Sequence, residues 1–193
     1  MSKEALMIIL DVGRSMGSLQ DNHTGMTGLD KAKSAFRMFR VASSLTPHTP
    51  SLIGLMVQQK LLFGYKQDVC GVLLFNSTKT ANPCHDEYGG YDSIEEYFPL
   101  QTPNLDLLEC IDNVQCNQNG TNGDSLDALL VAAQIIIKFA GKRKVRKRIF
   151  MITDAATDIH DVEQLDTIAE SFAQNSISFN CIGIGFHDDS DDD

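Results

Sequence analysis

The sequence predicts an α/β domain with a doubly wound, Rossmann-like, mostly parallel sheet and helices on both faces. Strand patterns and helix patterns alternate along the whole chain, which is typical of parallel sheets covered by helices. In addition, two apolar strand segments, Leu6–Asp11 and Ile149–Asp154, each end on an aspartate. Because parallel strands end at the same edge of a sheet, we expect both carboxylates at one edge, where ligands of α/β sheets bind.

The predicted strands are short apolar segments bounded by polar or glycine-containing turns. In chain order they are Ala5–Asp11, Val69–Phe75, a short edge strand at Tyr97–Leu100, Ile149–Asp154 and Ile177–Phe186.

The predicted helices carry apolar residues at helical spacing. They are a helix from about Leu29, a second one after the proline-containing break Ser43–Pro50, Leu105–Val114, Ser125–Phe139, and one from Val162 to Phe172. The segment Ser125–Phe139 is apolar nearly all round, so we expect it to be buried on the sheet. Asp124 directly precedes it and is expected to cap its first turn.

The composition is that of one globular domain. A chain of 193 residues with 42% hydrophobic content can bury a single core. We expect residues 1–187 to form the domain and residues 188–193 to be a disordered acidic tail. There is no apolar stretch of membrane-spanning length and no signal-peptide pattern, so we expect no membrane contact and an intracellular location.

Charge is distributed unevenly along the chain. The net charge of −10 argues against a domain that wraps nucleic acid by itself. Six of the 16 lysines and arginines nevertheless lie within residues 142–148. This basic run consists of Lys142, Arg143, Lys144, Arg146, Lys147 and Arg148. It is interpreted either as a solvated loop before the next strand, or as a nuclear-localisation signal or phosphate-contacting patch.

A degenerate metal site is predicted at the edge of the sheet. Asp11-Val12-Gly13-Arg14-Ser15 resembles the metal-ion-dependent adhesion motif of von Willebrand factor A domains, which reads Asp-x-Ser-x-Ser. In that resemblance Asp11, Ser15 and Asp154 match ligand positions, whereas Gly13 and Gly123 stand where a serine and a threonine would supply oxygens. Since two ligands are missing, we expect no tight metal binding and no cofactor.

Enzyme classes are disfavoured by missing motifs. The segment after the first strand does not match the dinucleotide pattern G-x-G-x-x-G, and no P-loop occurs. A haloacid-dehalogenase-type phosphatase needs a second acid two residues after Asp11, where this chain has Gly13. The five histidines pair with no convincing nucleophile. We therefore assign no catalytic residues.

Several segments together resemble one branch of the A-domain superfamily, the amino-terminal domain of the larger subunit of the Ku heterodimer. The segments that carry the resemblance are Asp11–Gly13, Thr80–Pro83, Leu105–Glu109, Leu126–Val131 and Lys147–Asp154. In order and spacing they cover about residues 5 to 186. A domains usually add a sixth strand and a last helix, which this sequence lacks, so we expect either a fragment or a domain whose final elements lie past the acidic segment.

The resemblance implies a role in DNA repair by non-homologous end joining. It implies a nuclear protein that pairs with the smaller Ku subunit. Parts of the Ku ring that this chain lacks would encircle double-stranded DNA ends, and this domain would recruit repair factors through short Ku-binding-motif peptides.

Those peptides are basic with hydrophobic anchors, so a groove beside acidic residues is expected. We predict it where the loop after the second strand approaches the start of the Ser125–Phe139 helix. Its residues would be Pro83, Cys84, Tyr88, Asp124, Leu126 and Leu130. Asp124 could instead serve as a cap, and Leu130 could lie in the core. The alternative function is a metal-dependent, ligand-binding A domain of adhesion type, which Gly13 and Gly123 disfavour.

Overall fold

The computed structural model describes residues 3–21, 25–37, 68–120, 122–160 and 162–185. The predicted break Ser43–Pro50, the helix after it and the acidic tail lie outside these residues. Within them, a five-stranded sheet has the order β5-β4-β1-β6-β7. The strands are β1 (Lys3–Asp11), β4 (Val69–Phe75), β5 (Ile94–Gln101), β6 (Val145–Thr153) and β7 (Ile177–Gly183).

The sheet is mostly parallel, as predicted. β1 pairs in parallel with β4 and with β6, and β6 pairs in parallel with β7. β5 runs antiparallel to β4 at the edge. It is longer than the predicted Tyr97–Leu100, because it begins at Ile94, which is buried and pairs with Phe75 of β4. A small antiparallel pair, β2 (Leu19–Asp21) and β3 (Met26–Thr27), was not predicted.

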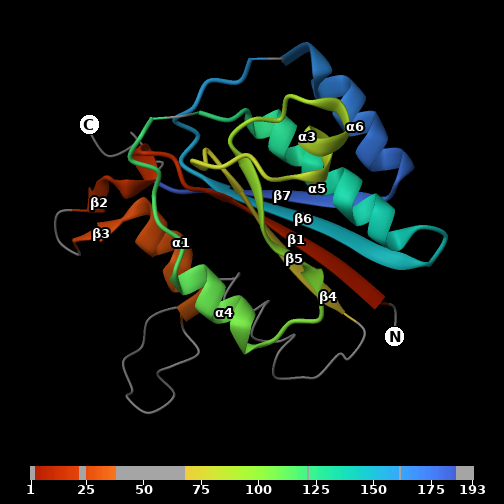
Figure 1. Ribbon diagram of the computed structural model, residues 1–193, viewed down its shortest axis with the longest axis horizontal. Coiled ribbons are helices and arrows are strands. Elements are labelled where there is room, and N and C mark those ends of the chain that lie inside the picture. Colours follow the sequence, from red (N-terminus) through yellow and green to blue (C-terminus); the bar gives the residue numbers. More distant parts are fainter. Residues whose placement is uncertain (1–2, 22–24, 38–67, 121, 161, 186–193) are drawn as a thin grey trace, which may run out of the picture.

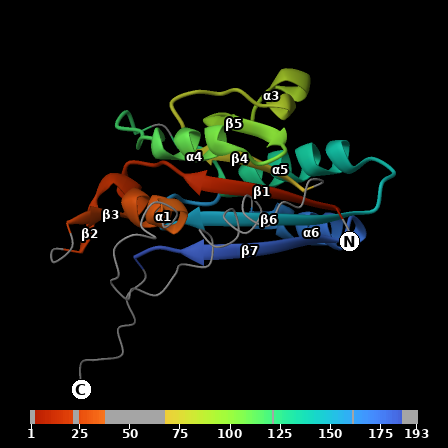
Figure 2. The same cartoon turned by 90° about the horizontal axis from the view of Figure 1, so that it is seen from below.

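Helices cover both faces of the sheet (Figure 1). On one face lie α3 (Pro83–Tyr88), α5 (Ser125–Ala140) and α6 (Leu165–Gln174), which share a core with alternate residues of the strands. On the other lie α1 (Gly28–Arg37) and α4 (Leu105–Asp112). Figure 2 shows the same layers from below. The predicted fold class is therefore confirmed.

The central helix α5 begins and ends for local reasons. Its amino-terminal cap is Asp124, whose Oδ1 accepts a hydrogen bond of 2.7 Å from the Leu126 amide. Its carboxyl end stops at Gly141, which has a positive φ of 51° that a residue with a side chain adopts less readily. Between them, nine side chains are buried, including Ile136 with no exposed surface. The expected buried helix and its Asp124 cap are confirmed.

The starts of two further predicted elements need correction. β6 begins at Val145, four residues before the predicted Ile149, because the basic run continues the ladder with β1. A 3₁₀ turn, Val162–Gln164, precedes α6. Val162 and Leu165 are 55% and 43% exposed, so the buried side chains of the predicted helix are Ile168 and Phe172 instead. None of the helices that the structure describes is long and apolar enough to cross a membrane.

Candidate functional site: a closed carboxyl edge and an exposed α3 corner

Asp11 occupies the carboxyl end of the central strand β1 and is completely buried. Its Oδ1 accepts hydrogen bonds from the Gly13 amide at 2.8 Å and from Asn76 Nδ2 at 2.9 Å. Its Oδ2 accepts one from the Thr153 hydroxyl at 2.6 Å. Burial raises the pKa of Asp11, and these hydrogen bonds oppose the rise because they favour the ionised form.

Asn76 is the residue that joins the segments of this edge. It follows β4 in a left-handed conformation, with a φ of 60°. Besides the bond to Asp11, its Nδ2 donates to the Thr157 hydroxyl at 3.0 Å, and its Oδ1 accepts from the Gly123 amide at 2.7 Å. Its backbone carbonyl accepts from Asn117 Nδ2 at 2.9 Å. One residue therefore holds together the ends of two strands and three loops.

The two glycines of the degenerate motif fit around this amide. A Cβ atom at Gly13 would lie 3.0 Å from Asp11 Oδ1 and 3.1 Å from Asn76 Nδ2. At Gly123 a Cβ atom would lie 3.1 Å from the Asp92 carbonyl and 3.4 Å from the Asn76 amide. The contacts of 3.0–3.1 Å are tighter than ordinary van der Waals packing. A side chain at Gly13 would thus compete with Asp11 and Asn76 for space, and one at Gly123 would compete with the Asp92 carbonyl.

Ser15 and Asp154 each make local contacts at this edge. Asp154 Oδ1 accepts from the Ala156 amide at 3.1 Å, which closes a local turn. Ser15 starts a short 3₁₀ turn, Ser15–Gly17, and its carbonyl accepts from the Ser18 amide. The described residues contain no group of three or more His, Cys, Asp or Glu side chains arranged to hold a metal ion. Because an amide N–H group faces Asp11 Oδ1, this set of donors does not fit a divalent cation.

Asn76, Thr153 and Thr157 were not among the residues predicted for this edge. A signal was available for Asn76, because it directly follows the buried strand Val69–Phe75 and must therefore reach the same edge as Asp11. Thr153 was passed over in favour of its neighbour Asp154, although side chains alternate along a strand and only one of the two can face Asp11.

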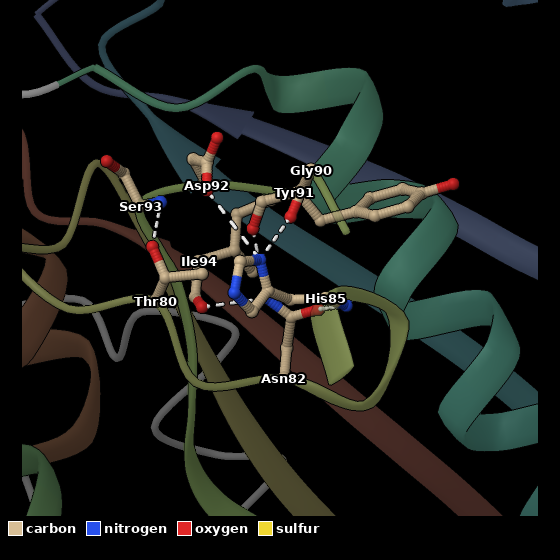
Figure 3. A network of polar contacts seen from close by, with 8 residues as sticks. All are labelled: Thr80, Asn82, His85, Gly90, Tyr91, Asp92, Ser93 and Ile94. Carbon is tan, nitrogen blue, oxygen red and sulfur yellow. Dashed lines mark hydrogen bonds and ion pairs between the residues drawn. The ribbon is translucent and has the colours of Figure 1, made fainter. Parts of the chain in front are cut away.

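The second part of the site is the α3 corner, which we define as residues 80–94 around the short helix α3. Figure 3 shows the polar contacts that hold this loop in place. Asn82 caps α3 by accepting from the His85 amide at 2.9 Å, and its Nδ2 donates to the Tyr91 and Ile94 carbonyls. His85 Nδ1 lies 2.6 Å from the Gly90 carbonyl. The corner is therefore internally braced.

The braced corner presents an aromatic side chain beside carboxylates. Tyr88, at the end of α3, is 66% exposed, and its hydroxyl donates to Glu87 Oε1 at 2.7 Å. The bond to this anion raises the pKa of Tyr88. Tyr91 packs partly against the core, where burial and the nearby charge of Asp127 raise its pKa. The corner thus combines exposed ring surface with at least two acidic groups.

The residues predicted for a peptide groove are brought only partly together. α3 packs against α5, and Cys84 is the predicted residue whose contact with that helix is established. Cys84 is buried and donates to Gln134 Oε1 of α5, and burial raises its thiol pKa to about 11. Leu126 is only 4% exposed and lies in the core, so it cannot seat an anchor in this conformation.

The other two predicted groove residues, Leu130 and Asp124, differ in how much of each is free to contact a peptide. Leu130 is partly buried against the core and retains some surface. Asp124 is engaged twice: beyond the cap, its Oδ2 accepts from the His160 amide at 2.9 Å and lies 3.4 Å from His160 Nδ1. The acidic residues that accompany the tyrosines are Glu87 and Asp127, which the sequence analysis did not include.

A hollow among the described residues lies elsewhere. It has a volume of about 270 Å³ and opens on the opposite face, between β4, β5 and the loop after α4. Its floor includes Val12, Leu74 and Val114. At its rim Glu95 is paired with Lys79 at 3.5 Å and accepts from the Ser77 hydroxyl at 3.0 Å. None of the predicted site residues lines it.

The basic run is placed in a turn and a strand. Residues 142–144 follow α5, and Arg146, Lys147 and Arg148 belong to β6. The interpretation of the whole run as a solvated loop is therefore wrong for its second half.

The sequence was compared with known protein families and with characterised proteins. The family described as "Ku70/Ku80 N-terminal alpha/beta domain" matches residues 29–193. X-ray repair cross-complementing protein 5 of Dictyostelium discoideum is 29% identical over 184 residues, covering 95% of this chain and 20% of that protein. The rice protein named ATP-dependent DNA helicase 2 subunit KU80 is 28% identical, covering 94% of this chain and 23% of its own length. The chain thus spans about a fifth of the relatives it matches.

Solved structures support the fold. A mussel byssus protein, proximal thread matrix protein 1 with a zinc-occupied MIDAS motif, superimposes with a TM-score of 0.59 at 15% identity, over 94% of this chain and 38% of that chain. An aerotolerance-related membrane protein from Bacteroides fragilis gives a TM-score of 0.57 at 18% identity, over 93% and 66% of the two chains. At these identities the likeness concerns the fold alone. On the family match and the two named relatives, the chain belongs to the Ku70/Ku80 amino-terminal α/β domains and is homologous to Ku80.

Proposed function

We propose that this chain is the amino-terminal protein-interaction domain of a Ku large subunit and acts as a scaffold in double-strand break repair by non-homologous end joining. The family match supports the Ku context. The observation that carries the interaction role is the α3 corner, where Tyr88 is 66% exposed on a braced loop beside Glu87. A fixed, exposed aromatic ring on an acidic surface suits protein recognition.

The chemistry of the α3 corner fits a basic peptide with a hydrophobic anchor. The Tyr88 and Tyr91 rings, together with the exposed part of Leu130, offer apolar contact area. The carboxylates of Glu87 and Asp127 add negative charge, and the net charge of −10 would attract a basic ligand from a distance. Short Ku-binding-motif peptides of repair factors have this composition, so we assign them to the α3 corner.

The rest of the proposed role belongs to the longer protein. The full-length chain would pair with the smaller Ku subunit in the nucleus, and double-stranded DNA ends would be held by parts that lie outside this chain. We assign no catalytic role and no cofactor to the domain. The Asp11 carboxylate is completely buried, so a substrate cannot reach it in this conformation. The amide of Asn76 likewise weighs against a metal-dependent adhesion domain.

Fluorescence anisotropy with a labelled, basic Ku-binding-motif peptide tests the proposal. We expect the chain to bind it, and Tyr88→Ala to weaken binding by about 2 kcal/mol, or roughly 30-fold, because a central aromatic anchor is lost. Glu87→Gln should weaken binding about tenfold, since a charge-assisted contact becomes neutral. Asp124→Asn should leave affinity unchanged, because asparagine caps a helix about as well as aspartate.

Phe179→Ala is the matched control, since Phe179 is an exposed aromatic residue of β7 on another part of the surface, 40% exposed. It should bind the peptide like the unmodified chain. The proposal fails if the folded chain does not bind the peptide, or if Phe179→Ala and Tyr88→Ala lower affinity equally. A tenfold loss with Asp124→Asn would move the peptide from the α3 corner to the start of α5.

A further inference from the structure

Two asparagines in the loop between α4 and α5 are each followed directly by a glycine. They are Asn119, before Gly120, and Asn122, before Gly123, and the sequence contains no other Asn-Gly pair. In such a pair the backbone nitrogen of the glycine can attack the side-chain carbonyl of the asparagine, because glycine has no Cβ atom to hinder the approach. Both pairs have the same local chemistry, so a difference in their reactivity must come from the fold.

The second pair is held by the hydrogen-bond network of the carboxyl edge. The Gly123 amide donates to Asn76 Oδ1 at 2.7 Å, and this contact is buried. The backbone is also tightly packed there, since a Cβ atom at Gly123 would lie 3.1 Å from the Asp92 carbonyl. The Gly123 nitrogen can attack Asn122 only after it has left Asn76. The reaction therefore requires a local opening of the structure, whose free-energy cost slows it.

The first pair lies on the surface and lacks these contacts. Asn119 and Gly120 are both exposed. Gly120 has a φ of 71°, and apart from its chain neighbours no atom lies within 4 Å of the place where its Cβ atom would be. The Gly120 amide donates to none of the described residues. Its nitrogen can therefore reach the Asn119 side chain without breaking a hydrogen bond to the described part of the domain.

We propose that Asn119 is a site of spontaneous deamidation in the folded chain, and that Asn76 protects Asn122 from the same reaction. The Gly120 nitrogen loses its proton and bonds to the side-chain carbonyl carbon of Asn119, and the side-chain amide leaves as ammonia. Water then opens the resulting succinimide at either of its carbonyls, which gives aspartate or isoaspartate. The reaction needs no oxidant, reductant or enzyme.

The modification changes the loop beyond the point where it is anchored. The product adds a negative charge to a chain whose net charge is already −10, and isoaspartate also lengthens the backbone by a methylene group. The preceding segment is fixed by Asn117, whose amide donates to the Val12 carbonyl at 2.7 Å and whose Nδ2 donates to the Asn76 carbonyl at 2.9 Å. The modified chain should therefore keep its closed carboxyl edge and its melting temperature.

The test is peptide mapping by mass spectrometry after incubation of the 193-residue chain at neutral pH in water enriched in heavy oxygen. Opening of the succinimide takes up oxygen from water, so the label separates deamidation during incubation from deamidation during digestion. Asn119 should react at least about tenfold faster than Asn122, because a buried hydrogen bond must open before Gly123 can attack. In guanidinium chloride, where the chain is unfolded, the two rates should become similar.

Two variants assign the difference to particular residues. Asn76→Ala removes the acceptor of the Gly123 amide, so it should raise the rate at Asn122 and leave the rate at Asn119 unchanged. Asn119→Gln is the control, because attack on the longer side chain closes a less favourable ring. It should abolish the product at this position and leave Asn122 as it was. Circular dichroism verifies that both variants are folded; if Asn76→Ala is not, the folded and unfolded states of the unmodified chain still decide the outcome.

Equal rates at Asn119 and Asn122 in the folded, unmodified chain would overturn the proposal, as would a faster reaction at Asn122. A difference that persists unchanged in guanidinium chloride would also overturn it, because the difference would then come from the sequence and not from the fold. If a folded Asn76→Ala variant leaves the rate at Asn122 unchanged, Asn76 does not protect it. These outcomes are independent of peptide binding, because neither asparagine belongs to the α3 corner.

Discussion

The two ends of the sheet handle charge in opposite ways. At the carboxyl end, the buried carboxylate of Asp11 is satisfied by three hydrogen bonds from within the domain. At the amino end, Lys142, Lys144 and Lys147 of the basic run have no ion-pair partner among the described residues. Ligands of α/β sheets usually bind at the carboxyl edge. In this domain the buried carboxylate at that edge is already bonded to protein donors, whereas lysines without an ion-pair partner among the described residues lie at the other end.

The closed state of the carboxyl end depends on one side-chain amide, that of Asn76. Asn76 places an N–H group against Asp11 and a carbonyl against Gly123, so a neutral side chain makes contacts that a cation would otherwise make. A buried polar network that is fully satisfied rigidifies a structure. Within the described residues no buried side-chain nitrogen or oxygen atom lacks a partner. Binding surfaces must then be sought where groups remain exposed, at the α3 corner and at the basic run.

The largest expected effect comes from removing the amide. Asn76→Ala orphans the Gly123 amide and one hydrogen bond of Asp11, and each buried unsatisfied group costs about 1–3 kcal/mol. We therefore expect the free energy of unfolding to fall by about 2–4 kcal/mol, measured by urea titration. Asn113→Ala, the same substitution at an exposed position after α4, should change it by less than about 0.5 kcal/mol. Equal stability of the two variants would show that the edge is not held by Asn76.

A smaller effect is expected in the dependence of stability on pH. The pKa of Asp11 is raised above its ordinary value of 3.8 in the folded domain. Between 3.8 and the raised value the folded state binds more protons than the unfolded state, so stability from this group is full below 3.8 and is lost as pH rises through the folded pKa. Asp11→Asn removes this titration.

The measurement is urea unfolding of both proteins from about pH 4 to pH 7. The free energy of unfolding of Asp11→Asn should gain on that of the unmodified chain as pH rises. A difference that stays constant over this range would mean that Asp11 titrates alike in the folded and unfolded states. A difference that falls would mean that the three hydrogen bonds outweigh burial and lower the pKa.

The smallest expected effect is that of divalent cations. Isothermal titration calorimetry with magnesium or manganese should show no binding below millimolar concentrations, because Gly13 and Gly123 bring no side-chain oxygen and Asn76 turns an N–H group towards Asp11. A micromolar dissociation constant that Asp154→Ala abolishes would contradict this. Asn76→Asp places a second carboxylate beside Asp11. In the same calorimetric titration this variant should bind the cation more tightly than the unmodified chain does.

The fold class, the central strands and the buried helix α5 could be predicted from the sequence. The pattern of apolar residues is enough to predict these elements, because β4 and α5 are apolar on nearly every face and the segments that flank them in the chain are polar. The Asp124 cap was predictable for a similar reason, since capping depends on a few consecutive residues. The start of β6 was missed because Arg146 and Arg148 read as loop, whereas Glu4 on the adjacent strand compensates them.

The edge itself was only half predictable. Local sequence places Asp11 and Asp154 after their strands, and it shows that Gly13 and Gly123 lack ligand oxygens. It does not show that Asn76, 65 residues from Asp11, turns its amide into the space between them. Likewise, Leu126 and Leu130 look equivalent in the chain, but the packing of α5 on the sheet buries one and leaves the other partly exposed.

What local patterns specify in this protein is the identity of its strands and helices, because burial periodicity and capping are properties of neighbouring residues. Which groups remain available for a partner depends on long-range contacts. Tyr88 is exposed because Asn82 and His85 brace the corner beneath it. Asp124 is occupied because His160 folds back onto it, and Asp11 is sealed because Asn76 reaches it. From the sequence alone, both carboxylates would be expected to be available to a ligand. Hydrogen bonds from residues distant in the chain satisfy them instead.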